Sequence, residues 1–191
     1  MTTASIAHAE PRRPPEAAIA TGAIAVGILA LLLRRLVLGT PQQGVVLLQI
    51  DAMLGLLAFA LPVAGGVRRL RWPLVIAVGL SAFVVATLAT QAPAPLPHGA
   101  GVLVFGSVAA LGEEAFFRRL VYGVLSGRGP AVAVLGSAVL FALVHVPIYG
   151  TTAFVVDLGA GLVLGWQRWA SGSWIPAGVT HVAANLLAVL R

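Results

Sequence analysis

Six side chains that could do acid–base or hydrogen-bond chemistry lie inside apolar stretches of this chain. They are two carboxylates, a guanidinium, two imidazoles and an amide: Glu113, Glu114, Arg118, His145, His181 and Asn185. An ionisable group at membrane depth is costly, so it persists mainly where it is paired or functional. Carboxylate and imidazole groups can activate a water, and imidazole and amide groups can stabilise an oxyanion. The pattern therefore predicts a catalytic site inside a membrane protein.

The composition excludes an ordinary soluble domain. Of the 191 residues, 59% are hydrophobic and only 9% are charged, and the mean hydropathy is +0.99. Soluble domains carry about 25% charged residues, so this chain could not cover its surface in water. The formal charge of +6 comes from dispersed arginines without a basic patch, which argues against nucleic acid as a partner and favours contact with a lipid bilayer. The absence of cysteine excludes thiol catalysis and disulfides.

The apolar runs predict an all-α, polytopic transmembrane bundle of about seven helices. A spanning helix needs about 20 mostly apolar residues. We expect a polar, Pro-rich tail at 1–16, helices without a chemical motif within 17–98, and the helices that carry the polar groups within 99–191. The individual helices are expected near 17–38, 44–66, 72–91, 99–126, 130–147, 151–169 and 174–190.

The distribution of arginine predicts the orientation in the membrane. With the N-terminus in the cytoplasm, nine arginines fall on the cytoplasmic side and three on the other, as the positive-inside rule requires. Arg34 and Arg35 fall on the opposite side and therefore do not agree with this orientation. The chain has arginine but no lysine and is rich in alanine and glycine, a composition typical of a bacterial product, so we expect it in the bacterial inner membrane. We also expect the active-site cavity to be reached from the cytoplasm.

Helical spacing predicts which of the polar groups meet. Glu114 and Arg118 are four residues apart with the acid first, which favours an ion pair. Glu113 is rotated by about 100° from Glu114 around the helix axis, so we expect it to lie outside the ion pair and to be free for another role. His181 and Asn185 share a face, and Phe141 lies beside His145. Counted along the helices, all four groups Glu113, His145, His181 and Asn185 fall in one layer near mid-membrane.

Each of these features also has a purely structural interpretation. Glu114 and Arg118 could be a structural salt bridge, and the histidines could be hydrogen bonds between helices. Asp51 and Asp157 are interpreted as structural hydrogen-bonding groups. A zinc ion could be held by Glu113, His145 and His181, but no His-Glu-x-x-His pairing occurs, so a water activated directly by glutamate requires fewer assumptions.

Three motifs in this order resemble the CPBP family of intramembrane endopeptidases. This family includes the type II CAAX prenyl proteases, bacteriocin-processing proteins and proteins like lysostaphin resistance A. The resemblance extends from Gly99 to Arg191. Its motifs Glu-Glu-x-x-x-Arg, Phe-x-x-x-His and His-x-x-x-Asn stand here at Glu113–Arg118, Phe141–His145 and His181–Asn185. One departure is Arg119, where many relatives carry glycine.

The resemblance implies roles for the matching residues. Glu113 would be the general base, assisted by His145, while His181 and Asn185 would stabilise the oxyanion. Glu114, Arg118 and Phe141 would shape the site. The implied partner is a membrane protein or peptide substrate, including a prenylated one. The family has also been described as metal-dependent, so zinc stays an alternative to catalysis without a cofactor.

Two further classes of function remain open from the sequence. One is a non-catalytic immunity or scaffold protein that binds a partner in the same cavity. The other is a proton-coupled transporter built on the intramembrane acids, which the lack of an inverted repeat makes less favourable.

Overall fold

The structure is a computed structural model that describes residues 14–63, 66–90 and 100–189, and within these ranges all regular structure is helical. The Pro-rich segment around Pro93 to Pro97, His98 and most of the N-terminal tail lie outside the described residues. The expected all-α bundle of about seven helices is confirmed. Its helices are α1 (Pro14–Val37), α2 (Gln43–Phe59), α3 (Trp72–Thr90), α4 (Ala100–Glu114), α6 (Pro130–Tyr149), α7 (Ala153–Ser171) and α8 (Ile175–Val189).

The fourth helical segment is not a regular α-helix along its length. Directly after Glu114 the chain enters a π-helix at Ala115–Val121, followed by the short α5 (Tyr122–Leu125) and a 3₁₀ turn at Ser126–Arg128. π-Helical turns are rare and occur often at functional sites. Here the wide turn begins at the residue that follows the two adjacent carboxylates.

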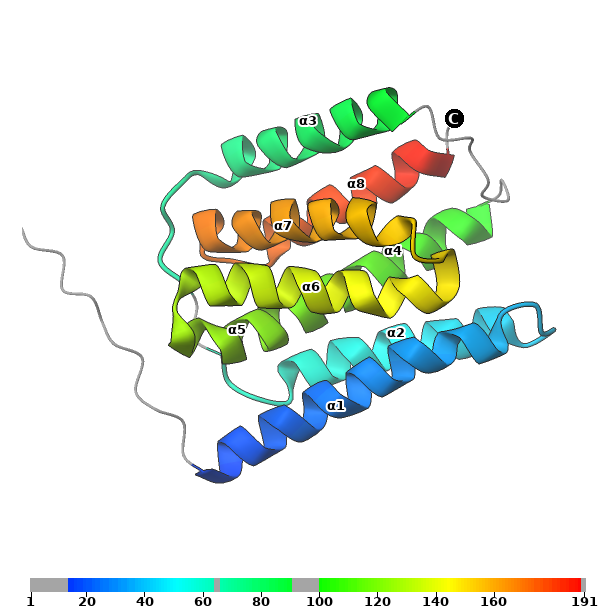
Figure 1. Ribbon diagram of the computed structural model, residues 1–191, viewed down its shortest axis with the longest axis horizontal. Coiled ribbons are helices and arrows are strands. Elements are labelled where there is room, and N and C mark those ends of the chain that lie inside the picture. The colour runs from blue at the N-terminus through cyan, green and yellow to red at the C-terminus, as the bar shows by residue number, and fades with distance from the viewer. Residues whose placement is uncertain (1–13, 64–65, 91–99, 190–191) are drawn as a thin grey trace, which may run out of the picture.

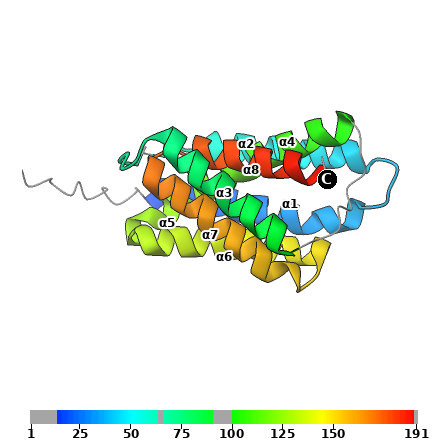
Figure 2. The same ribbon diagram turned by 90° about the horizontal axis from the view of Figure 1, so that it is seen from above.

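The helices form a closed circuit around this π-helix. Neighbouring helices follow the order α1, α2, α4, α8, α3, α7, α6 and back to α1. The π-helix packs against α1, α2, α4, α6, α7 and α8 of that circuit. Figures 1 and 2 show α2 and α4 along one side of the bundle, and α6 and α7 along the other. The segment that carries the carboxylates is therefore surrounded by protein.

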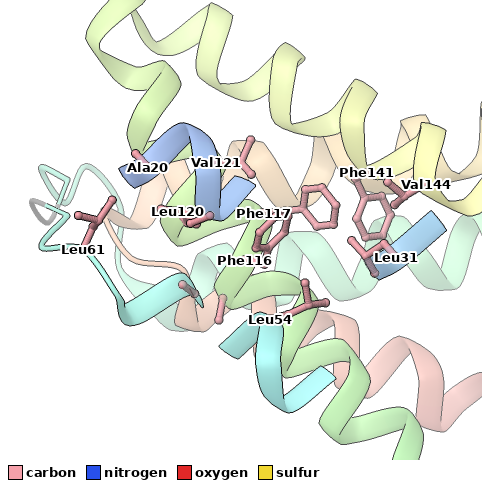
Figure 3. Packing of buried hydrophobic residues seen from close by; sticks show 13 residues of the cluster. Ala20, Leu31, Leu54, Leu61, Phe116, Phe117, Leu120, Val121, Phe141 and Val144 are labelled. Carbon is pink, nitrogen blue, oxygen red and sulfur yellow. The ribbon is translucent and has the colours of Figure 1, made fainter. Parts of the chain in front are cut away.

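A cluster of aromatic and branched side chains fills the centre of the bundle (Figure 3). The rings of Phe116 and Phe117 meet edge to face with centroids 5.1 Å apart, and Phe117 meets Phe141 in the same way at 5.4 Å. Leu31 from α1 and Leu54 from α2 complete the packing. Such aromatic pairs favour fixed relative orientations, so this core holds α6 rigidly against the π-helix.

Prolines explain where two helices depart from their expected bounds. Helix α1 begins at Pro14 rather than at residue 17, because proline fits the first helical turn, where no backbone N–H is needed. Helix α2 ends at Phe59 rather than at residue 66, because Pro62 has no N–H to continue the ladder.

Arg119 stabilises this early end of α2. Its Nη1 donates to the carbonyl oxygens of Ala58 and Leu61, the latter at 3.1 Å, and its guanidinium lies 4.3 Å from the ring centroid of Phe59. The arginine that departs from the family pattern therefore caps a helix end.

The outer surface of the bundle is apolar. Large hydrophobic side chains on every helix are exposed, including Leu56 at 75% and Leu88 at 68%. Among the described residues, Glu16–Val37 and Pro130–Tyr149 are long and apolar enough to cross a membrane, while Gln43–Phe59, Trp72–Leu88 and Ile175–Ala188 are apolar but shorter. An outward-facing apolar surface of this extent suits a lipid environment.

Candidate active site

Glu113 lies at the centre of a charged cluster contributed by three helices. Its Oε1 accepts a hydrogen bond from Nη1 of Arg34, on α1, at 2.5 Å. The Nη2 of the same guanidinium pairs with Oδ1 of Asp51, on α2. All three side chains are buried, with exposures of 5–7%. One arginine thus serves two carboxylates, and these three groups together carry one net negative charge.

His145 faces the other oxygen of Glu113. Its Nε2 lies 3.8 Å from Glu113 Oε2, and its Nδ1 lies 2.7 Å from the carbonyl oxygen of Phe141. A carbonyl oxygen only accepts hydrogen bonds, so Nδ1 must carry a proton. In the neutral ring, Nε2 is then a free proton acceptor directed at Glu113. The ring is held between Phe141, with centroids 4.5 Å apart, and Tyr149, stacked at 5.9 Å.

Glu114 belongs to a second, separate pair of interactions. Its Oε2 lies 3.0 Å from Nε of Arg118, and its Oε1 lies 3.1 Å from Nδ1 of His181. Glu114 and Arg118 have no exposed surface. The expected ion pair at a spacing of four residues is confirmed, and it fixes the orientation of an imidazole on α8.

Asn185 is one helical turn beyond His181 and is held by the backbone of α4. Its Nδ2 donates to the carbonyl oxygen of Gly106 at 3.2 Å. That bond uses one amide hydrogen and leaves the second available. His181 similarly uses Nδ1 towards Glu114 and leaves Nε2 available. The two residues therefore each keep one polar atom that is not engaged by these contacts.

Phe141 separates the two carboxylate–imidazole pairs. Its ring lies 4.5 Å from that of His145 and 5.9 Å from that of His181, and the guanidinium of Arg118 lies 5.1 Å from its centroid. It is 3% exposed. The expected placement beside His145 is confirmed, and the ring also contacts the second pair.

A cavity of about 420 Å³ connects the pair Glu113 and His145 with His181 and Asn185 on α8. Glu113, His145, His181 and Asn185 all line it, so the four groups that were expected in one layer share one cavity. Glu114 and Arg118 do not line the cavity but lie behind it. The remaining walls come from five helices and include Arg34, Asp51, Leu47, Phe105, Ile148 and Tyr149.

The cavity extends to one end of the bundle. Leu38, Gln43 and Gly44, at the turn between α1 and α2, line it. This turn lies at the same end as the beginning of α4 and the ends of α6 and α8 (Figure 1). The opposite end carries the beginning of α1. The lining residues at the turn therefore lie at the end of the bundle opposite to the beginning of α1.

The expectation that Glu113 is free was wrong, because Arg34 contacts it from a distant part of the chain. From the sequence, Asp51 is expected to be a structural hydrogen-bonding group, and Arg34 is noted only because its position opposes the expected orientation. The missing signal was charge balance. Arg118 pairs with Glu114, so the buried acids Asp51 and Glu113 require a further cation, and Arg34 supplies it. Tyr149 was also missed, although it lies four residues after His145.

The polar residues, as arranged, do not fit a metal site. Among the described residues, no group of three or more His, Asp or Glu side chains is placed to hold a metal ion. Arg34 occupies one oxygen of Glu113, and His181 directs Nδ1 at Glu114. The three residues expected to ligate zinc, Glu113, His145 and His181, are thus divided between different partners.

Comparison with known proteins gives one match. Residues 95–187 match the family model described as type II CAAX prenyl endopeptidase Rce1-like. This range contains all three motifs and ends before the last residues of α8, whereas Arg34 and Asp51 lie outside it. No curated protein and no solved structure matches the chain.

Proposed function

We propose that this chain, which belongs to the CPBP family through its Rce1-like region, hydrolyses a peptide bond inside the membrane with a water activated by Glu113. The family consists of membrane-embedded CAAX-type endopeptidases, which are hydrolases that act on membrane-associated protein substrates. The observation that carries the mechanism is the pairing of Glu113 Oε2 with His145 Nε2 across 3.8 Å at the cavity wall. Both atoms can accept a proton.

A water fits between these two acceptors. Hydrogen bonds from water to oxygen or nitrogen are about 2.8 Å long, so a single water can donate one hydrogen to each atom. Both of its hydrogens are then engaged, and a lone pair is directed towards the cavity. Holding the nucleophile in this way favours attack on a carbonyl carbon placed beside it.

Proton transfer and stabilisation of the oxyanion complete the reaction. As the water oxygen bonds to the carbonyl carbon, its proton passes to Glu113, with His145 as the second acceptor. The negative charge on the former carbonyl oxygen is stabilised by the second amide hydrogen of Asn185 and by Nε2–H of His181 when that ring is protonated. Glu114 supplies the counter-charge for the protonated ring. The C–N bond then breaks, and the leaving amine takes the proton from Glu113.

The substrate we propose is a membrane protein or a membrane-associated peptide, and a prenylated C-terminal peptide is one member of that class. The apolar walls of the cavity, with Leu47, Phe105 and Ile148, suit apolar substrate side chains. We further propose that the protein resides in the bacterial inner membrane with its N-terminus in the cytoplasm. Arg68, Arg69, Arg71 and Arg128 are exposed at the end of the bundle where α1 begins, and Arg35 is exposed at the other.

The test compares the termini of membrane proteins in cells carrying the wild-type protein or Glu113→Gln, by terminal-peptide mass spectrometry. Glu113→Gln keeps the side-chain volume and removes the base, so termini present with the wild type should disappear. The control is Glu16→Gln, because Glu16 is exposed in the first turn of α1.

Two outcomes would contradict the proposal. Cleavage that persists with Glu113→Gln would remove Glu113 from the reaction. Identical profiles with and without the wild-type protein, with all variants folded in the membrane, would favour an immunity or scaffold protein that binds its partner in this cavity.

A further inference from the structure

Two residues of the charged cluster around Glu113 come from outside the region that matches the family: Arg34, which contacts Glu113, and Asp51, which contacts Arg34. Arg34 is near the end of α1 and Asp51 is in the middle of α2, whereas the match begins at residue 95. Both line the cavity, at exposures of 7% and 5%. The first two helices, which carry no motif, thus contribute charged groups to the proposed catalytic centre.

The way Arg34 divides its contacts leaves one oxygen of Glu113 available. Nη1 of Arg34 binds Oε1 of Glu113, and Nη2 binds Asp51 instead of the second glutamate oxygen. Oε2 is therefore left facing His145. A guanidinium is planar and rigid, so its contact with Oε1 also restricts rotation of the glutamate carboxylate.

Asp51 prevents a competing arrangement. An arginine alone with one carboxylate favours a bidentate pair, with two parallel N–H···O bonds. In this site such a pair would also engage Oε2 of Glu113 and lower the basicity of the oxygen that faces His145. Asp51 holds Nη2 and excludes that pair.

We propose that Arg34 and Asp51 are positioning residues of the catalytic centre: together they fix Glu113 through Oε1 and keep Oε2 open to the attacking water. The proposal rests on the function proposed above. Arg34 and Asp51 touch neither the water nor the substrate in this scheme, and they act through Glu113.

A purely structural role for the same contacts makes a different prediction. As a link between α1, α2 and α4, the cluster would affect folding, and loss of Asp51 would lower the amount of active protein without changing the turnover of each molecule. As a positioning device, Asp51 affects kcat through its effect on Glu113. Asp51→Leu distinguishes these roles, because it removes the acceptor while Arg34 and Glu113 remain a neutral pair.

The experiment measures kcat, KM and thermal stability of purified full-length protein in detergent, with a cleavable substrate identified from the terminal-peptide comparison. We expect Asp51→Leu to stay folded and to lower kcat by about tenfold or more, because general-base catalysis is worth roughly 10²–10⁴-fold. KM should stay within about twofold. Asp51→Glu should restore most of kcat, and Arg34→Lys should lower it, because an ammonium lacks the planar fork. Arg35→Lys is the matched control, since Arg35 is exposed.

Stability provides a second readout that is independent of turnover. Glu113→Gln should lower the melting temperature more in the Asp51→Leu background than in the wild type, because the Arg34–Glu113 pair becomes bidentate when Asp51 is absent. The melting temperatures test the positioning proposal. The proposed function is tested separately, by the loss of cleavage in the Glu113→Gln single variant.

Three results would overturn the proposal. The first is a kcat for Asp51→Leu within about twofold of the wild type, given that general-base catalysis would supply far more. The second is an equal effect of Glu113→Gln on stability in both backgrounds. If Asp51→Leu does not fold, Asp51→Asn replaces it, and misfolding of that variant as well would assign Asp51 a structural role only.

Discussion

The ion pair between Glu114 and Arg118 allows a quantitative test of how the site is held together. Glu114→Ala removes a carboxylate whose oxygens lie 3.0 Å from Arg118 Nε and 3.1 Å from His181 Nδ1. Arg118 is fully buried, so its charge would remain without a counter-ion and without access to water. At 3.0 Å and an effective dielectric constant of about 20, the lost Coulomb attraction is about 5.5 kcal/mol.

Breaking a buried pair by removing one partner costs about 3–5 kcal/mol in proteins, which is close to this value. For a chain of this size, 1 kcal/mol changes the melting temperature by roughly 2–4 °C. We therefore expect Glu114→Ala to lower the melting temperature in detergent by roughly 6–20 °C. Glu114→Gln keeps an oxygen near Arg118 and should fall between Glu114→Ala and the wild type.

The assay is thermal unfolding of the purified protein in detergent, followed by circular dichroism. Glu16→Ala is the matched control, because it makes the same chemical change at an exposed position and should change the melting temperature by no more than about 2 °C. The double variant Glu114→Ala/Arg118→Leu should be more stable than Glu114→Ala, because the unpaired charge is gone. A melting temperature for Glu114→Ala equal to that of Glu16→Ala would refute the reasoning.

Three further predictions concern other parts of the molecule. Arg119→Ala should destabilise the protein by about 1–2 kcal/mol, because two carbonyl groups at the end of α2 lose their donor, whereas exposed Arg128→Ala should have little effect; equal melting curves would contradict the capping role. Because the chain has no cysteine, Gln43→Cys, at the turn between α1 and α2, and Gly127→Cys, at the opposite end, can be labelled with an impermeant maleimide in intact cells. Gln43→Cys should react and Gly127→Cys should not, and the reverse pattern would place the N-terminus outside. Dialysis against a strong chelator should leave proteolysis intact, and a loss that Zn²⁺ restores would replace the direct role of Glu113 with metal-assisted hydrolysis.

Contacts between residues close in the chain were predictable from the sequence. The pairing of Glu114 with Arg118 and the packing of Phe141 beside His145 follow from a spacing of four residues on a helix. Counting along the apolar runs also predicted that Glu113, His145, His181 and Asn185 share a layer, because a spanning helix rises by a fixed amount per residue.

Contacts between distant helices were not predictable in the same way. Depth specifies where a residue lies along the bundle, but it does not specify which helices are neighbours. The circuit of helices packs α2 against α4, and α1 against α2 and the π-helix, and only that arrangement brings Arg34, held by Asp51, to Glu113. The π-helix was missed as well, because hydrophobic periodicity does not distinguish one wide turn within an apolar segment.

The sequence by itself determined a helical, apolar chain with acid, imidazole and amide groups at one depth, since composition and helical rise act locally. The tertiary structure decided how those groups are divided. Glu114 pairs with Arg118 and His181, and Glu113 pairs with Arg34 and faces His145. The physical reason is that a buried charge must find a partner wherever the packed helices supply one, and that partner can be far away in the sequence.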